Sequence, residues 1–312
     1  MAVYKAQVFG TIDTKARLSP LYALFVPIIA LILLMFTQFF SLLGAGAVGI
    51  SLIELEESST KSLIYILFVS FGLASLAAFA WVKFVESRSL VSMGWRFERA
   101  WSRYSRGFLI GLMLNVAAIT IIAAAGGYEV GKWFAALTNP AALVLIIVFM
   151  FGFIIQGGTE EVLFRGWVMS SMAARWGIPI AVGVSSSLFA ALHLANEWPH
   201  VNWIAMANIV LVGVFFAIFA IRERSLLGVC AAHSSWNWIM SVGFGLNVSG
   251  MKIDAEPLLV SLQQKTEMAN WITGGSFGPE GSLAVTIVLG VATLLVWRWQ
   301  GDAQSQRANK GE

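Results

Sequence analysis

Two adjacent carboxylates, Glu160 and Glu161, lie inside an otherwise apolar stretch of the sequence and are followed by Arg165. A charged group costs several kcal/mol at the depth of a bilayer, so an ionisable residue in such a stretch indicates a functional site by default. Glu161 and Arg165 have the i,i+4 spacing that permits an ion pair on one helical face. Glu160 lies about 100° around the same helix and has no partner in the local sequence. The pattern therefore predicts one paired acid and one acid that is free to react.

Two of the three histidines, His193 and His233, also fall in apolar segments, whereas His200 does not. His233 and Asn237 share one helical face because they are four residues apart. A carboxylate base, a histidine partner, and an imidazole and an amide that donate to an oxyanion are the components of hydrolysis. For each polar group taken singly, the alternative is hydrogen bonding between helices, at roughly 0.6–2 kcal/mol per bond.

Other chemistries fit the sequence less well. An aspartyl mechanism needs two aspartates in the membrane, but all of them lie outside the apolar segments: Asp13, Asp254 and Asp302. Ser185 and His193 are about 12 Å apart along a helix axis, so only His233 could serve as the base of a serine mechanism. Cys230, the single cysteine, is expected to be a packing residue. A transporter would also use buried acids, but usually shows broken helices in paired halves, and here the acids and histidines cluster in the second half.

The composition indicates a polytopic membrane protein. Of the 312 residues, 58% are hydrophobic and 12% are charged, against about 25% charged in soluble domains. Backbone groups in lipid must be paired within each segment, so apolar windows of spanning length predict helices. The eight windows are Leu21–Leu43, Ser62–Val82, Gly107–Ala125, Ala141–Gly158 (which runs on through the glutamates), Pro179–Ala195, Trp203–Ile221, Leu226–Leu246 and Leu283–Trp299. We therefore expect an all-α fold of about eight transmembrane helices, with one domain over residues 21–300 between tails at 1–20 and 301–312.

Basic residues predict the orientation of these helices. Taken in order, the segments outside the windows hold 3, 1, 6, 1, 2, 0, 2, 2 and 3 lysines and arginines, so odd-numbered segments hold 16 of the 20. This pattern places both termini in the cytoplasm under the positive-inside rule. We interpret the segment Lys83–Arg106 as a solvated cytoplasmic anchor. The segment Asn247–Gly281 is punctuated by glycine and proline, and we interpret it as a connector, with a cover for a cavity mouth as the alternative.

Three motifs in this order on successive helices resemble those of the CAAX protease and bacteriocin-processing (CPBP, or Abi) family of intramembrane endopeptidases. The motifs are Glu160-Glu161-x-x-x-Arg165, Phe189-x-x-x-His193 and His233-x-x-x-Asn237. The resemblance covers about residues 141–250. It implies an eight-helix α bundle with a catalytic cavity inside the membrane, in a multi-pass protein of the bacterial inner membrane. It also implies a peptide or protein substrate, with a lipidated C-terminus as one form of that substrate, and no nucleic acid.

The resemblance also implies roles for individual residues. Glu160 would activate water with the assistance of His193, and His233 and Asn237 would stabilise the oxyanion. Glu161 and Arg165 would form a supporting ion pair. No cofactor is expected; the alternative is a Zn²⁺ site made by Glu160, His193 and His233, which has the His₂Glu ligand set of soluble metalloproteases. A non-catalytic scaffold or immunity protein of the same fold is a further alternative.

Two features do not fit simply. If the fourth span ends just before Glu160, that residue lies near the cytoplasmic face, whereas His233 lies about 10 Å and His193 about 20 Å from that face at 1.5 Å per residue. Groups that act on one bond must share a depth, so we expect the fourth span to lie at roughly Phe149–Met172. The turn Arg222-Glu223-Arg224 lacks the glycine that we expect from bacterial members of the family.

Overall fold

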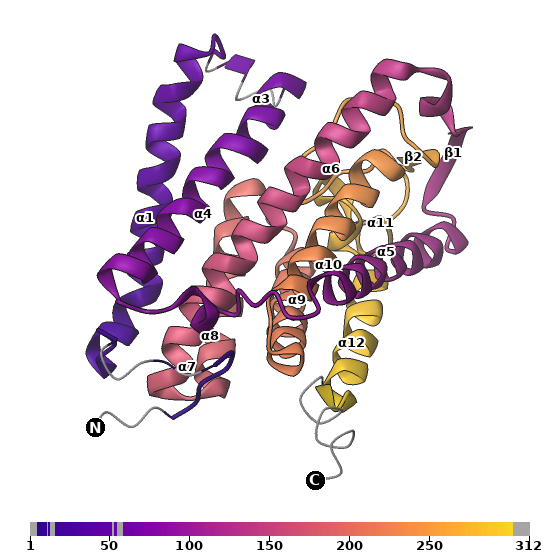
Figure 1. The fold of residues 1–312 in the computed structure, drawn as a ribbon. Helices are drawn as coiled ribbons and strands as arrows, with labels where there is room; N and C mark the ends of the chain where they lie inside the picture. Colours follow the sequence, from indigo (N-terminus) through magenta and orange to yellow (C-terminus); the bar gives the residue numbers. More distant parts are fainter. Residues whose placement is uncertain (1–4, 11, 13–15, 52, 55–58, 302–312) are drawn as a thin grey trace.

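The computed structural model describes residues 5–10, 12, 16–51, 53–54 and 59–301 (Figure 1). Asp13, Asp302 and the rest of the C-terminal tail lie outside the described residues. The α-helices and strands are α1 (Pro20–Ala47), α3 (Thr60–Tyr65), α4 (Phe71–Ala80), α5 (Ala100–Ala124), β1 (Tyr128–Trp133), α6 (Pro140–Glu161), α7 (Ser170–Trp176), α8 (Ile178–His193), α9 (Trp203–Glu223), α10 (Leu227–Trp238), β2 (Val260–Gln264), α11 (Asn270–Thr273) and α12 (Leu283–Arg298). Short π- and 3-10 helices extend or connect them: η1 (Ile66–Ser70), η2 (Trp81–Val85), η3 (Leu90–Met93), η4 (Ala135–Thr138), η5 (Val162–Met169), η6 (Leu194–Asn196), η7 (Ile239–Gly243), η8 (Gly275–Phe277) and η9 (Pro279–Gly281).

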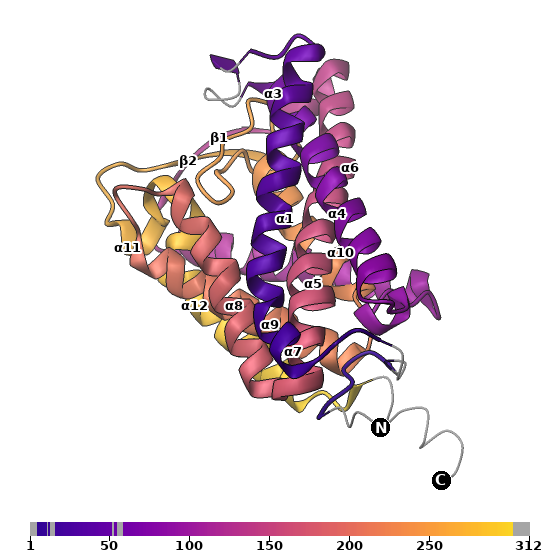
Figure 2. The same cartoon turned by 90° about the vertical axis from the view of Figure 1, so that its left-hand side faces the viewer.

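The polytopic all-α fold is confirmed, and each of the eight apolar windows coincides with a helical segment. Within the described residues, 6 helices are long and apolar enough to cross a membrane: Pro20–Ala47, Thr60–Val85, Ala100–Ala124, Pro140–Trp176, Ile178–Asn196 and Trp203–Glu223. The helical segments of the last two windows, α10 with η7 and α12, are shorter. Helix α1 begins and α12 ends at the same end of the bundle (Figures 1 and 2), as an even number of crossings requires.

The helix that carries the two glutamates is longer than the sequence suggested. Helices α6, η5 and α7 form one continuous helix of 37 residues, Pro140–Trp176, and Glu160 lies near its middle. The helix extends beyond the end of the hydropathy window at Gly158, and the expected span Phe149–Met172 lies within it, because neighbouring helices, rather than water, surround the charged residues. The π-helix η5 begins directly after Glu161. Such segments often occur at functional sites because they alter the direction of side chains within a helix.

Helix α10 is the central element of the bundle and packs mainly against α5 and α6. Glycines on α5 permit the close approach of the two backbones. A Cβ atom at Gly107 would lie 2.0 Å from the carbonyl oxygen of Gly228, and one at Gly111 would lie 2.1 Å from that of Ala232. Small residues at helix contacts of this kind are typical of membrane proteins. The contact fixes the depth and rotation of α10, which carries His233 and Asn237.

A two-stranded sheet, which the all-α prediction did not include, joins two connections outside the bundle. Strands β1 and β2 are antiparallel, with Tyr128 opposite Gln264 and Val130 opposite Leu262. The Tyr128 side chain is buried, and this burial raises the pKa of its hydroxyl above the ordinary value. Strands this short give no hydropathy signal of their own. Their pairing ties the segment between α5 and α6 to the long segment before α12.

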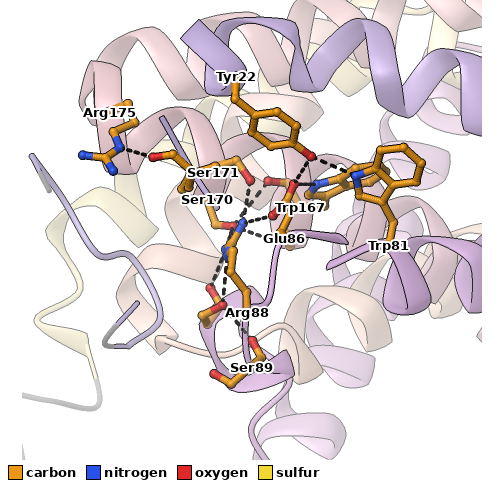
Figure 3. A network of polar contacts seen from close by, with 12 residues as sticks. Tyr22, Trp81, Glu86, Arg88, Ser89, Trp167, Ser170, Ser171 and Arg175 are labelled. Carbon is orange, nitrogen blue, oxygen red and sulfur yellow. Dashed lines mark hydrogen bonds and ion pairs between the residues drawn. The ribbon is translucent and has the colours of Figure 1, made fainter. Parts of the chain in front are cut away.

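A buried ion pair between Glu86 and Arg88 lies at the end of the bundle where α1 begins (Figure 3). The Arg88 guanidinium lies 2.9 Å from Glu86, and neither side chain has exposed surface. Arg88 also donates to the hydroxyl groups of Ser171 at 2.6 Å and Ser170 at 2.8 Å. Glu86 accepts from the indole of Trp167 at 2.6 Å. The interpretation of this segment as a solvated anchor is therefore wrong at Arg88, which fastens the chain after η2 to η5 and α7.

The turn after α9 forms without the expected glycine. Arg224 adopts the left-handed conformation, with φ 55° and ψ 31°, in which a non-glycine residue costs roughly 1–2 kcal/mol. The adjacent Glu223 has no exposed surface and pairs with Arg106 at 2.6 Å. Glu223 also accepts from the backbone N–H of Gly228 at 2.8 Å. These bonds hold the turn and the start of α10 in place.

Candidate active site

The three helices that carry the predicted site residues, α6, α8 and α10, meet at a cavity of about 340 Å³. Four sequence-predicted residues line this cavity: Glu160 from α6, His193 from α8, and His233 and Asn237 from α10. The wall also includes residues of α1, the second span, α9 and α12. The long helix containing Glu160 thus brings its carboxylate to the depth of both histidines, which removes the difference in depth that the hydropathy windows implied.

Glu160 faces His233 across the cavity wall. Its Oε2 atom lies 3.4 Å from Nε2 of His233, and 13% of the Glu160 side chain is exposed. This oxygen is buried and accepts no hydrogen bond within the described part of the chain. A carboxylate oxygen without a bonded donor at a cavity is available to a water molecule or a substrate.

Glu161 contacts more than the arginine with which its spacing suggested a pair. Its Oε1 atom lies 3.0 Å from Nη1 of Arg165 and 2.8 Å from Nδ1 of His233. A carboxylate paired with arginine has no proton to donate, so Nδ1 of His233 is the donor in the second contact. This bond fixes the rotation of the imidazole and points Nε2 toward Glu160. Glu161 therefore positions His233 as well as neutralising Arg165.

Aromatic rings complete the surroundings of Arg165. The guanidinium carbon lies 4.7 Å from the ring centre of Phe189 and 5.6 Å from that of Phe216. Phe216 also stacks on the His233 imidazole, with ring centres 5.2 Å apart. The Nε and Nη2 atoms of Arg165 are buried and have no hydrogen-bond partner among the described residues, so the ring faces provide the remaining attraction for the cation.

His193 does not pair directly with Glu160. Its Nδ1 atom lies 2.8 Å from the carbonyl oxygen of Phe189, four residues earlier in α8. A carbonyl oxygen only accepts, so Nδ1 carries the hydrogen and Nε2 carries the free lone pair. In the neutral imidazole this contact selects the tautomer whose Nε2 atom can accept a hydrogen bond at the cavity.

Gln156 is a cavity residue that the sequence analysis missed. Its Oε1 atom accepts a hydrogen bond from Nδ2 of Asn237 at 2.9 Å, and both residues line the cavity. This bond orients the Asn237 amide and leaves its second N–H for another acceptor. One signal could have identified Gln156, because it precedes Glu160 by four residues and therefore shares its helical face.

Other candidate residues lie elsewhere. Ser185 and Cys230 are buried but do not line this cavity. His200 lines a separate cavity near Glu197 and Asn202. Within the described ranges, no group of three or more histidine, cysteine, aspartate or glutamate residues is placed so that it could hold a metal ion.

Residues 141–239 match the model of the Rce1-like family, described as type II CAAX prenyl endopeptidase Rce1-like. The resemblance to the CPBP family is confirmed. The match covers 99 of the 312 residues and includes all four of the predicted residues on the cavity wall. No curated protein and no solved structure matches the chain. The chain is thus a multi-pass membrane protein with a segment that is similar to the type II CAAX prenyl endopeptidase family.

Proposed function

We propose that this protein is an intramembrane endopeptidase that hydrolyses a peptide bond of a membrane-associated substrate. The observation that carries the proposal is the position of Glu160, whose unbonded Oε2 lies at a cavity wall shared with His193, His233 and Asn237. Glu160 has no lysine or arginine as an ion-pair partner among the described residues, and an acid of this kind is costly in the membrane. Hydrolysis accounts for such an acid, because the reaction requires a base within hydrogen-bond reach of a water molecule.

In the proposed reaction, Glu160 takes a proton from water as the water oxygen attacks the carbonyl carbon of the scissile bond. The resulting tetrahedral oxyanion accepts hydrogen bonds from Nδ2 of Asn237 and from a protonated Nε2 of His233. Protonated Glu160 then donates its proton to the leaving amine as the C–N bond breaks. Donors that are already oriented toward the developing charge lower the barrier because they need no reorganisation.

His193 would orient the attacking water through its free Nε2 atom. Glu161 would act through His233 by holding the imidazole, which makes it a positioning residue in this scheme. A lipid-modified C-terminus is the substrate feature that the description of the matching family suggests. The apolar rings around the site are compatible with a substrate that arrives from the bilayer.

The direct test compares purified wild-type protein with Glu160→Gln in liposomes, using a farnesylated peptide that ends in a C-a-a-X sequence. We expect cleavage to fall by about 10²- to 10⁴-fold, the usual contribution of a general base. Glu98→Gln is the matched control, because this glutamate side chain is 67% exposed and lies away from the cavity. Comparison of membrane-protein termini between wild-type and Glu160→Gln cells would identify natural substrates.

Equal cleavage by Glu160→Gln and wild type would contradict the proposal. Full function of a His193→Ala/His233→Ala variant in cells would instead favour a non-catalytic scaffold. Zinc bound at about one equivalent, with activity lost to a chelator and restored by zinc, would instead support the metal-dependent alternative at Glu160, His193 and His233.

A further inference from the structure

Glu280 is a second carboxylate on the wall of the cavity, and the proposed reaction does not use it. It lies in η9, within the glycine-rich motif Gly278-Pro279-Glu280-Gly281 just before α12, and its residue is 8% exposed. The segment that the sequence suggested was a connector therefore contributes directly to the cavity. Val248, Ser249 and Met251, at its other end, line the cavity as well.

Several bonds hold the Glu280 carboxylate in one position. Its Oε2 atom accepts from the backbone N–H of Ser249 at 2.7 Å and from the Ser249 hydroxyl at 2.9 Å. Its Oε1 atom accepts only one longer bond, from the indole N–H of Trp236 at 3.3 Å. Asn208 donates to the Glu280 backbone carbonyl at 2.8 Å. A Cβ atom at Gly278 would lie 2.3 Å from the Asn247 carbonyl oxygen, so the glycine is needed for this close packing.

The donors to Glu280 are all neutral, which sets it apart from the glutamates that have no exposed surface. Each of those has an arginine partner: Glu86 with Arg88, Glu161 with Arg165, and Glu223 with Arg106. Glu280 has no ion pair within the described part of the chain, and the described residues that line the cavity include no lysine or arginine. A buried carboxylate with open acceptor capacity and no cation attracts a cation from outside the protein.

We propose that Glu280 binds a basic side chain, lysine or arginine, of the substrate next to the scissile bond. The inference rests on the proposed function, since it takes the cavity as the place where a peptide binds. Trp236, which donates to Glu280, follows His233 by three residues on α10, a rise of about 4.5 Å. One residue of extended peptide spans about 3.3–3.6 Å, so a basic residue at Glu280 belongs within a few positions of the reacting carbonyl. The same carboxylate disfavours an acidic residue at that position.

The test is affinity selection from a degenerate peptide library, randomised over eight positions, on purified Glu160→Gln protein, which retains peptides without cleaving them in the proposed mechanism. We expect lysine and arginine to be enriched among the retained peptides by about 10- to 100-fold, as a charge-assisted hydrogen bond predicts. The double variant Glu160→Gln/Glu280→Gln should lose this enrichment. Glu160→Gln/Glu197→Gln is the matched control, because Glu197 is also 8% exposed and lies in the same region but outside the cavity.

Retained peptides without an excess of basic residues would overturn the inference, as would equal enrichment in the protein with Glu280→Gln. If the Glu280→Gln protein does not fold, resynthesis of the retained peptides with norleucine in place of the basic residue, measured on Glu160→Gln alone, decides the question: undiminished binding overturns the inference. Failure of the proposed function is a separate result, since it would show as cleavage by Glu160→Gln at the wild-type rate whatever the binding preference.

Discussion

Two buried glutamate–arginine pairs lie in this bundle, and they differ in how completely their atoms are bonded. Neither pair has exposed side-chain surface. Every nitrogen of the Arg88 guanidinium donates to a partner, and both oxygens of Glu86 accept. In the Glu161–Arg165 pair, which lies behind His233, one oxygen of Glu161 and two nitrogens of Arg165 have no hydrogen-bond partner among the described residues.

The difference separates a pair whose bonding capacity is fully used from a pair next to the candidate site whose bonding capacity is not. A buried charge whose bonding capacity is fully used stabilises one conformation and has no further capacity for a ligand. A buried charge with unused capacity costs free energy in the absence of a partner. Evolution retains such a cost at functional sites, where a substrate or a water molecule completes the bonding. The two pairs can therefore be distinguished by experiments that measure stability and activity separately.

The largest effect on stability is expected for Arg88→Met. Removing the cation leaves Glu86 buried without a partner charge, and breaking a buried pair in this way costs about 3–5 kcal/mol. The free energy of unfolding, measured in detergent with a denaturant, should fall by that amount. The activity of each folded molecule should stay near the wild-type value, because this pair does not touch the cavity.

The double variant Glu86→Leu/Arg88→Met is the control for this experiment. It removes both charges, and replacement of a whole buried pair by apolar residues is often close to neutral. Loss of activity without loss of stability in Arg88→Met would contradict a purely structural role for the Glu86–Arg88 pair.

A smaller effect, confined to the rate, is expected for Gln156→Leu. Without its acceptor, the Asn237 amide is free to rotate, so kcat should fall by about 10- to 100-fold, as when a supporting residue of an active site is removed. The KM should change little, because the oxyanion forms only in the transition state. Steady-state kinetics on a cleavable peptide measure both quantities.

Two further variants sharpen this prediction. Gln156→Glu keeps an acceptor oxygen and should recover much of the lost rate. Gln156→Leu combined with Asn237→Ala should be no slower than Asn237→Ala alone, since the two residues act through one hydrogen bond. Independent, multiplicative losses in the double variant would show that Gln156 has a different role.

Of these three variants, Tyr22→Phe is expected to have the smallest effect, a loss of stability from removing one hydrogen bond to Glu86. The Tyr22 hydroxyl donates to Glu86 at 3.1 Å and accepts from the Trp81 indole at 2.9 Å. Glu86 keeps its bonds from Trp167 and Arg88, so the loss should be about 1–2 kcal/mol. The change would be measured by the same unfolding experiment. A loss as large as that of Arg88→Met would mean that Tyr22, rather than the ion pair, holds this end of the bundle together.

The sequence predicted the local relations and, through the order of the motifs, the meeting of the main site residues, but it missed individual bonds between distant segments. The i,i+4 spacing of Glu161 and Arg165 was sufficient to predict their contact, because helix geometry fixes which residues share a face. The bond from His233 to Glu161 joins residues 72 positions apart, and spacing says nothing about such pairs. The motif order suggested that His233 and Glu160 meet, yet not that Glu161 holds the imidazole.

Hydropathy located the helices but did not fix the end of the fourth span. A window average falls wherever charged residues occur, so it fell before Glu160, although the helix continues to Trp176. The same average treated Arg88 as exposed, whereas it is 2% exposed. Average hydropathy cannot represent charges that are bonded inside the protein. The short strands β1 and β2 were missed because their pairing is between segments more than a hundred residues apart.

Replacing the left-handed Arg224 is expected to increase the stability of this protein during purification. Glycine adopts that conformation freely, so Arg224→Gly should recover about 1 kcal/mol, less the extra chain entropy that glycine brings to the unfolded state. The midpoint of thermal unfolding should rise by a few degrees. Unchanged heat tolerance would show that the arginine side chain offsets its own strain. A more heat-stable protein with an unaltered cavity would allow the cleavage of slowly hydrolysed substrates to be measured for longer.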